Sequence, residues 1–299
     1  MLLSTIFVLT VYLTMKNILL ALAILSGIFF PYGHNYVFLI RYFLMLLLFF
    51  SFLDIKVNKN IINKIHFHIL SIIVFSSIIF FYAIKSFNLY IAQAVFITSI
   101  APTAIAAPVI ISLRKRNIEF VMFSLLLNNI VISLVIPFLF PLITNSNNSI
   151  KISDVLFPIL VTISIPLFAS QIIKIITPAI WKKLVEWKDS SYYILIANIY
   201  IAVSDASTFI RNENGDNILI VLIIAISSGL LCLFYFSLGW FIGGRNYPAE
   251  ASQSLGQKNN AFTIWLALTY LSPIVALGPV FYVLYQNVYI SWVLYKSNK

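Results

Sequence analysis

The sequence predicts an all-α membrane protein with about ten transmembrane helices, arranged as two inverted repeats of five helices each. The composition is the first reason: 61% of the 299 residues are hydrophobic and 9% are charged, whereas a soluble domain carries roughly 25% charged residues. The second reason is a series of apolar stretches long enough to cross a bilayer. The third is that two of these stretches are interrupted at matching positions of the two halves, a pattern typical of inverted-repeat transporters.

The apolar stretches define the order of the elements. A helix needs about 20 predominantly apolar residues to cross the hydrocarbon core of a bilayer. The expected spans are residues 17–31, 35–53, 65–84, 88–112, 118–143, 152–176, 190–208, 217–243, 249–271 and 274–295. Residues 2–15 are also apolar but short for a crossing, so we expect an interfacial or re-entrant segment, or the leading part of the first span. The chain therefore divides into an N-terminal segment (1–16), a first repeat (17–144) and a second repeat (152–299).

Basic residues alternate in abundance from loop to loop. The opposite loops hold three, at Lys85, Lys151 and Arg211. The loops after the even-numbered spans and the C-terminal tail hold thirteen, namely Lys56, Lys59, Lys64, Arg114, Lys115, Arg116, Lys174, Lys182, Lys183, Lys188, Arg245, Lys296 and Lys299. Cytoplasmic loops of membrane proteins carry the excess of Lys and Arg, so both ends of the ten-span bundle are expected in the cytoplasm, and the cytoplasmic (inner) membrane of a prokaryote is the expected location. Because the charge is spread over loops, the net charge of +10 does not indicate nucleic-acid binding.

The fourth span is expected to unwind. It contains Pro102 and Pro108, and a proline inside a helix removes one backbone hydrogen bond and clashes with the preceding turn. Small residues and Thr103 lie between the two prolines. Irregular backbone at membrane depth is tolerated only where it is buried in protein or lines a water-filled cavity. The segment is therefore a candidate binding site.

The ninth span carries the second interruption, a run of consecutive polar residues after Gly256: Gln257, Lys258, Asn259 and Asn260. A charge at the centre of a membrane helix costs roughly 2.5–3.5 kcal/mol even on lenient insertion scales. Such a charge is tolerated where it faces a cavity or a partner, so Lys258 is the leading candidate for a functional residue. Where two broken helices cross, helix N-termini and C-termini meet near the bilayer centre, which makes a small polar site for ions or charged solutes.

Other polar residues fall within or next to the spans. Asn128 and Asn129 lie in the fifth span, where they either pack between helices or line a cavity. Glu250 precedes Lys258 by two helical turns, with Ser254 between them on the same helical face, and is expected at the cytoplasmic mouth of the span. Arg41 is expected to extend toward the external interface. No cluster of paired carboxylates or histidines indicates an enzyme, a metal or a cofactor.

Several of these segments resemble the bile acid:sodium symporter family. Residues 256–262 are similar to its Gly-Met-Gln-Asn-Ser-Gly-Leu signature, and residues 273–291, with Gln286 and Asn287, are similar to its last span. Residues 101–117 resemble its Pro-Gly-Gly-Thr-Ala-Ser-Asn span and the basic turn that follows. The resemblance covers residues 17–299 and implies ten helices in two inverted repeats. It also implies a core domain (spans 3–5 and 8–10) beside a panel domain (spans 1, 2, 6 and 7).

The sequence departs from this family at the sodium sites. Ser254 stands where the family has a sodium-binding Glu, and Lys258 stands where it has Gln. Its Ser-Asn pair falls on Ala107 and Pro108. Sodium coupling is therefore not expected, and the ammonium of Lys258 is expected to replace a bound cation. Lys258 either keeps its charge throughout or releases its proton when substrate leaves, and the latter would couple transport to protons.

The expected function is secondary transport of a small organic anion across the lipid bilayer by alternating access. The resemblance implies the substrate class, and the charge of Lys258 agrees with an anion. One alternative is a crossed-helix cation/proton antiporter, which the lack of an acidic pair at the crossing argues against. The other is a ligand sensor that does not transport. The expected substrate- or ion-binding residues are Lys258, Ser254, Asn259, Asn260, Gln257, Thr103, Pro102, Pro108, Asn128, Asn129, Gln286 and Asn287.

Overall fold

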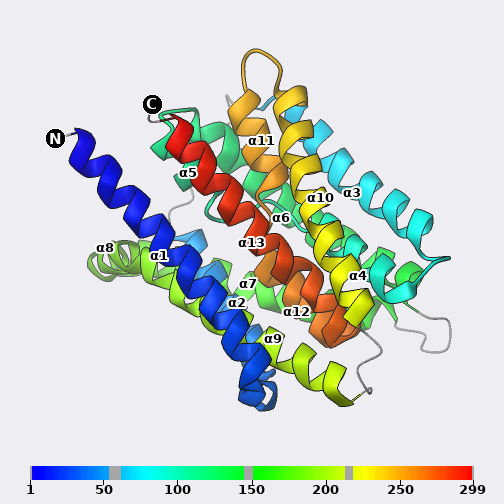
Figure 1. Cartoon of the computed structure of the whole chain (residues 1–299). Coiled ribbons are helices and arrows are strands. Elements are labelled where there is room, and N and C mark those ends of the chain that lie inside the picture. Colours follow the sequence, from blue (N-terminus) through cyan, green and yellow to red (C-terminus); the bar gives the residue numbers. More distant parts are fainter. Residues whose placement is uncertain (1, 54–61, 145–150, 213–217, 298–299) are drawn as a thin grey trace.

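The structure is a computed structural model that describes residues 2–53, 62–144, 151–212 and 218–297. Every element in this part of the chain is helical (Figure 1). In order, the elements are α1 (Leu2–Phe29), η1 (Pro31–Tyr36), α2 (Leu39–Phe52), α3 (Lys64–Ile84), α4 (Leu89–Ser99), α5 (Ala107–Leu113), α6 (Ile118–Ile143), α7 (Ile152–Ile176), α8 (Pro178–Glu186), η3 (Trp187–Ser190), α9 (Ser191–Asn212), α10 (Ile218–Gly243), α11 (Pro248–Gly256), α12 (Asn260–Tyr270) and α13 (Pro273–Ser297).

Asparagine caps fix where three helices begin. The Oδ1 atoms of Asn63, Asn88 and Asn117 accept hydrogen bonds from the backbone N–H groups near the starts of α3, α4 and α6, at 3.0–3.1 Å. An N-cap side chain satisfies one of the N–H groups that the first helical turn leaves without a partner. These starts agree with the expected starts of the third, fourth and fifth spans to within a residue.

The apolar character of the helices is that of an integral membrane protein. Among the described residues, six helices are long and apolar enough to cross a membrane: α3, α6, α7, α9, α10 and α13. Large apolar side chains on them face outward, and Phe75, Ile79 and Phe241 are 63–81% exposed. Such surfaces are unfavourable in water and suit contact with lipid. Residues 2–15, for which the sequence allows three arrangements, belong to the continuous helix α1 together with residues 17–29.

The helices pack as two neighbouring groups. One group contains α1, α2, α7 and α9, in which α1 contacts α9 and α2 contacts both α7 and α9. The other contains α3, α4, α5, α6, α10, α11, α12 and α13, with α13 running through the middle of the view in Figure 1. The two groups meet mainly where α9 and α1 contact α13, where α7 contacts α6, and where α12 contacts α2 and α9.

Two contacts define the ends of the bundle. At one end, the backbone N–H of Asn117 donates to Oε1 of Glu250 at 3.0 Å, and the rings of Phe120 and Tyr247 stack 4.7 Å apart. This end, called here the Arg114 end, thus holds both the turn at residues 114–117 and the start of α11. At the opposite end, called here the Asp154 end, the hydroxyl of Tyr270 donates to the backbone carbonyl of Asp154 at 3.1 Å.

Candidate functional site

The two interruptions expected from the sequence meet and pair with each other. The break between α4 and α5 covers residues 100–106, and the break between α11 and α12 covers residues 257–259. Thr103 and Lys258 face each other as an antiparallel bridge. On either side of it, the N–H of Ala104 donates to the carbonyl of Gln257 at 2.7 Å, and the N–H of Asn259 donates to the carbonyl of Pro102 at 2.8 Å. Each break thus supplies hydrogen-bond partners to the other, as irregular backbone at membrane depth requires.

The two prolines act differently from the expectation that both unwind the segment. Pro102 lies in the extended part, and its carbonyl accepts a hydrogen bond across the crossing. Pro108 lies in the first turn of α5 and is half-buried. A proline in the first turn is compatible with a helix because its missing N–H would have no partner there anyway. Pro108 therefore helps to restart the helix and is not part of the crossing itself.

Lys258 holds the centre of the crossing. Its side chain is 1% exposed, and Nζ donates to the carbonyl of Ser99 at 2.8 Å. Nζ also lies 4.0 Å from the centroid of the Tyr235 ring, on α10. Ser99 is the last residue of α4, where unpaired carbonyls concentrate the negative end of the helix dipole. A helix C-terminus and an aromatic face both attract cations, and no carboxylate among the described residues pairs with this ammonium.

Three polar side chains lock the other side of the bridge. The Oγ1 atom of Thr103 donates to the carbonyl of Ser254 at 2.6 Å and accepts from Nδ2 of Asn128 at 2.7 Å. The Nδ2 atom of Asn129 donates to the carbonyl of Thr103 at 2.9 Å. Both asparagines come from α6 and are buried. Of the two interpretations left open for Asn128 and Asn129, the contacts favour packing against the crossing.

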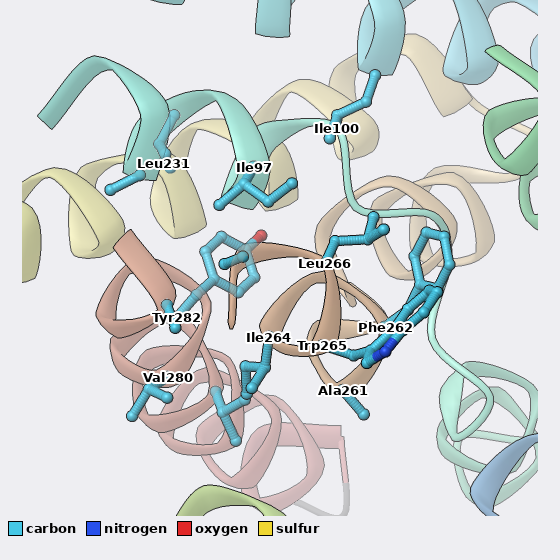
Figure 2. Packing of buried hydrophobic residues seen from close by; sticks show 14 of the residues in the cluster. Ile97, Ile100, Leu231, Ala261, Phe262, Ile264, Trp265, Leu266, Val280 and Tyr282 are labelled. Carbon is cyan, nitrogen blue, oxygen red and sulfur yellow. The ribbon is translucent and has the colours of Figure 1, made fainter. Parts of the chain in front are cut away.

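Gln286 on α13 supports Lys258 from a third direction. Its Oε1 accepts from the backbone N–H of Lys258 at 3.1 Å and from Nδ2 of Asn260 at 3.3 Å. The hydroxyl of Tyr282, one turn earlier, donates to the carbonyl of Gly256 at 2.7 Å, which satisfies the C-terminal end of α11. Figure 2 shows Tyr282 among the buried apolar side chains of α4, α10, α12 and α13. The polar crossing therefore lies inside a close-packed apolar shell.

The remaining predicted site residues, Asn259, Gln257, Ser254 and Asn287, make different contacts around the crossing. Asn259 caps α12 by accepting from the N–H of Phe262 at 3.4 Å, and Oε1 of Gln257 accepts from Nε2 of Gln253 at 2.6 Å. The hydroxyl of Ser254 is fully buried and has no hydrogen-bond partner among the described residues. Asn287 is half-buried beside Gln286, and its side chain makes no hydrogen bond within the described part of the chain.

The expected helical face shared by Glu250, Ser254 and Lys258 does not exist. Because α11 ends at Gly256, Lys258 follows extended backbone and no longer obeys the helical period. Glu250 is 3% exposed and binds Asn117 at the Arg114 end, away from the crossing. Arg41 donates from Nε to Oγ1 of Thr162 at 3.0 Å, and its extension toward the external interface stays a prediction.

Sequence reasoning missed the groups that hold the ammonium. Ser99 and Tyr235 lie in apolar helices and belong to no recognisable motif. A lysine inside a membrane span implies a partner, and that is the only signal the sequence offers. Within the described residues, no group of His, Cys, Asp and Glu is arranged to hold a metal ion. Chemically, the site is a cation-binding site made of a helix C-terminus and an aromatic ring, and the ammonium of Lys258 occupies it.

Comparison with known proteins gives no family assignment. No protein-family model matches the sequence, and no curated protein matches it significantly.

Proposed function

We propose that this protein is a secondary transporter that moves a small organic anion across the membrane by alternating access, without sodium coupling. In this proposal Lys258 replaces a bound cation. The observation that carries the proposal is the position of its ammonium, 2.8 Å from the Ser99 carbonyl at the end of α4 and 4.0 Å from the centroid of the Tyr235 ring. A buried charge with this environment is expensive for a purely structural role.

The pattern of helix contacts supports the two inverted five-helix repeats. If α1, α2, α3, α4, α5 and α6 are exchanged with α7, α9, α10, α11, α12 and α13, most contacts map onto one another. The contact of α1 with α9 becomes that of α7 with α2, and the contact of α3 with α4 becomes that of α10 with α11. Likewise, the contact of α5 with α6 becomes that of α12 with α13, and that of α4 with α13 becomes that of α11 with α6.

The contacts that break this exchange lie between the two groups of helices. The second half-helix α12 contacts α2 and α9, whereas its counterpart α5 has no comparable contact with either among the described residues. Residues 259–267 are all buried, but Ala106, at the start of α5, is exposed. We therefore interpret the group of α1, α2, α7 and α9 as a panel closed over the Asp154 end and open toward the Arg114 end. Alternating access would exchange these two arrangements.

The basic residues support one orientation of the bundle in the membrane. Arg114, Lys115, Arg116 and Arg245 all lie at the Arg114 end. Cytoplasmic loops carry the excess of basic residues, and this supports an orientation in which the Arg114 end faces the cytoplasm. Among the rival functions, a cation/proton antiporter would need a carboxylate at the crossing, and Glu250 lies at the Arg114 end instead. Measuring the flux of solute across liposome membranes distinguishes a transporter from a sensor that binds a ligand without transporting it.

The test is uptake into liposomes that contain the purified full-length protein. Radiolabelled monocarboxylates, from acetate to octanoate together with benzoate, serve as probes in sodium and in choline medium. We expect saturable uptake of at least one anion with the same affinity in both media. A tenfold tightening specific to sodium, equivalent to about 1.4 kcal/mol, would contradict a lysine that replaces the cation.

A matched pair of lysine variants ties uptake to the crossing. Lys258→Ala should reduce uptake strongly. Lys85→Ala is the control, because Lys85 also lies over a tyrosine ring, at 4.2 Å from the centroid of Tyr82, but outside the crossing. Lys258→Arg keeps a permanent charge. Uptake should therefore be preserved if the charge of Lys258 is fixed during transport, and any dependence of uptake on an imposed pH gradient should disappear. If Lys258→Ala transports as fast as the unmodified protein with and without that gradient, the role assigned to Lys258 is wrong.

A further inference from the structure

Arg41 is a second cationic side chain at an interface between apolar helices, and the crossing does not use it. It lies in the first turn of α2 and is half-buried. Its Nε atom donates to Oγ1 of Thr162 on α7 at 3.0 Å, and Thr162 is fully buried. The guanidinium is thus fixed in position by the neighbouring helix. An ionisable residue held between membrane helices indicates a functional site.

The terminal nitrogens of Arg41 make no hydrogen bond or ion pair with any described residue, and they are not sealed from solvent. A guanidinium held at Nε still presents N–H groups in a planar fork, and this fork matches the two oxygens of a carboxylate. The arrangement resembles an anion receptor more than a structural ion pair, because a structural pair would have placed a carboxylate here.

The surroundings place this fork at the seam between α2, α7 and α12. The helix α2, which carries Arg41, contacts both α7 and α12. At the end of α12, the hydroxyl of Tyr270 donates to the backbone carbonyl of Asp154 on α7. The Tyr270 ring is held edge-on by Phe140 and Trp265, with centroids 5.5 and 6.3 Å away. Tyr270 is therefore packed on the side of α12, and this part of the seam lies at the Asp154 end of the molecule.

We propose that Arg41 is a docking site for the carboxylate of an organic anion, separate from Lys258 and at the external end of the seam between α2, α7 and α12. The proposal rests on the proposed function for its biological sense, since docked substrate would enter when the panel opens at this end. Binding itself can be measured without transport. The exposed carboxylate of Asp154 does not pair with Arg41, and its charge opposes an approaching anion.

The test measures binding to the purified full-length protein by isothermal titration, with benzoate as the probe and benzamide as its uncharged counterpart. We expect benzoate to bind more tightly than benzamide. Arg41→Gln should weaken benzoate binding at least tenfold, a loss of about 1.4 kcal/mol, and leave benzamide unaffected. Arg41→Lys keeps the charge but loses the fork, so it should fall between the two. Arg211→Gln, a second arginine at the same end by the loop assignment, is the control and should change nothing.

Asp154→Asn provides a variant with the opposite sign. The backbone carbonyl that receives Tyr270 remains, while the opposing charge disappears, so benzoate binding should tighten about two- to threefold, as expected for a screened surface charge. Unchanged benzoate affinity in Arg41→Gln, or equal binding of benzoate and benzamide by the unmodified protein, would overturn the docking site. Uptake assays separate this result from the transport proposal. If the protein takes up anions but benzoate binding does not depend on Arg41, the transport proposal stands and the docking site is rejected. If benzoate binding depends on Arg41 but no anion is taken up, the docking site is supported and the transport proposal is rejected.

Discussion

Replacing Lys258 with methionine removes the ammonium while keeping a long, flexible side chain of similar volume. The substitution deletes the hydrogen bond to the Ser99 carbonyl and the contact with the Tyr235 ring. It leaves the backbone bridge to Thr103 intact, because that bridge uses main-chain groups. The change therefore tests the charge separately from the crossing.

The opposing free energies nearly cancel. A hydrogen bond from a charged donor contributes about 1.5–3 kcal/mol, and a desolvated cation–π contact contributes about 2 kcal/mol. Against this, burying an ammonium costs several kcal/mol even after the protein relaxes. We expect the free energy of unfolding to change by less than about 2 kcal/mol, with either sign, since replacing buried charges by apolar residues is often neutral or stabilising. Transport should nevertheless be lost.

The assay combines thermal unfolding of the detergent-solubilised variant with uptake into liposomes. A stable but inactive protein is the expected result, and it is the pattern of a residue retained for function at a cost in stability. Two outcomes would refute the reasoning. A loss of stability greater than about 3 kcal/mol would make Lys258 a structural residue whose charge is well compensated, and normal uptake would show that the charge has no role in transport.

Three further predictions concern the crossing and the conformation. Thr103→Val removes the hydroxyl that joins Asn128 to the Ser254 carbonyl. The unfolding free energy should fall by about 1–3 kcal/mol, which is the cost of buried polar groups left unpaired. Thr103→Ser keeps the hydroxyl and should recover most of this loss in the same unfolding assay, and equal stability of the two variants would contradict the assigned hydrogen bonds. Gly256→Ala places a methyl group against the buried ring of Phe236, and this overpacking should lower the unfolding free energy by about 1–3 kcal/mol. The smaller side chain in the double variant Gly256→Ala/Phe236→Leu should relieve the clash, so additive losses of stability in that variant would argue against it. Cys232 is the single cysteine of the sequence and is replaced first. A cysteine introduced at Ala106 should then react with an impermeant maleimide from the cytoplasmic side, whereas one at Ala261, which is 5% exposed, should be protected. Reaction from the external side would reverse the orientation.

Local chemistry in the sequence was enough to place most of the long helices and the two interruptions, whereas α8 falls between two expected spans. Asparagines at 63, 88 and 117 satisfy N–H groups within three residues, so the starts of their helices could be predicted. Pro102 and the polar run after Gly256 interrupt helices through the backbone itself, which makes these breaks visible in one dimension. The role of Pro108 differs from the expectation because a proline can either end a helix or begin one, and neighbouring residues alone do not decide which.

The partners of Lys258 were decided only by the tertiary structure. Ser99 and Tyr235 come from two other helices, and the pairing of Thr103 with Lys258 joins residues 155 positions apart. The same holds for Arg41, because its hydrogen-bond partner Thr162 lies on α7, 121 positions away in the sequence. Sequence periodicity reports which groups a helix must bury or satisfy. It cannot report which distant group satisfies them, because that choice is made by the packing of whole helices against one another.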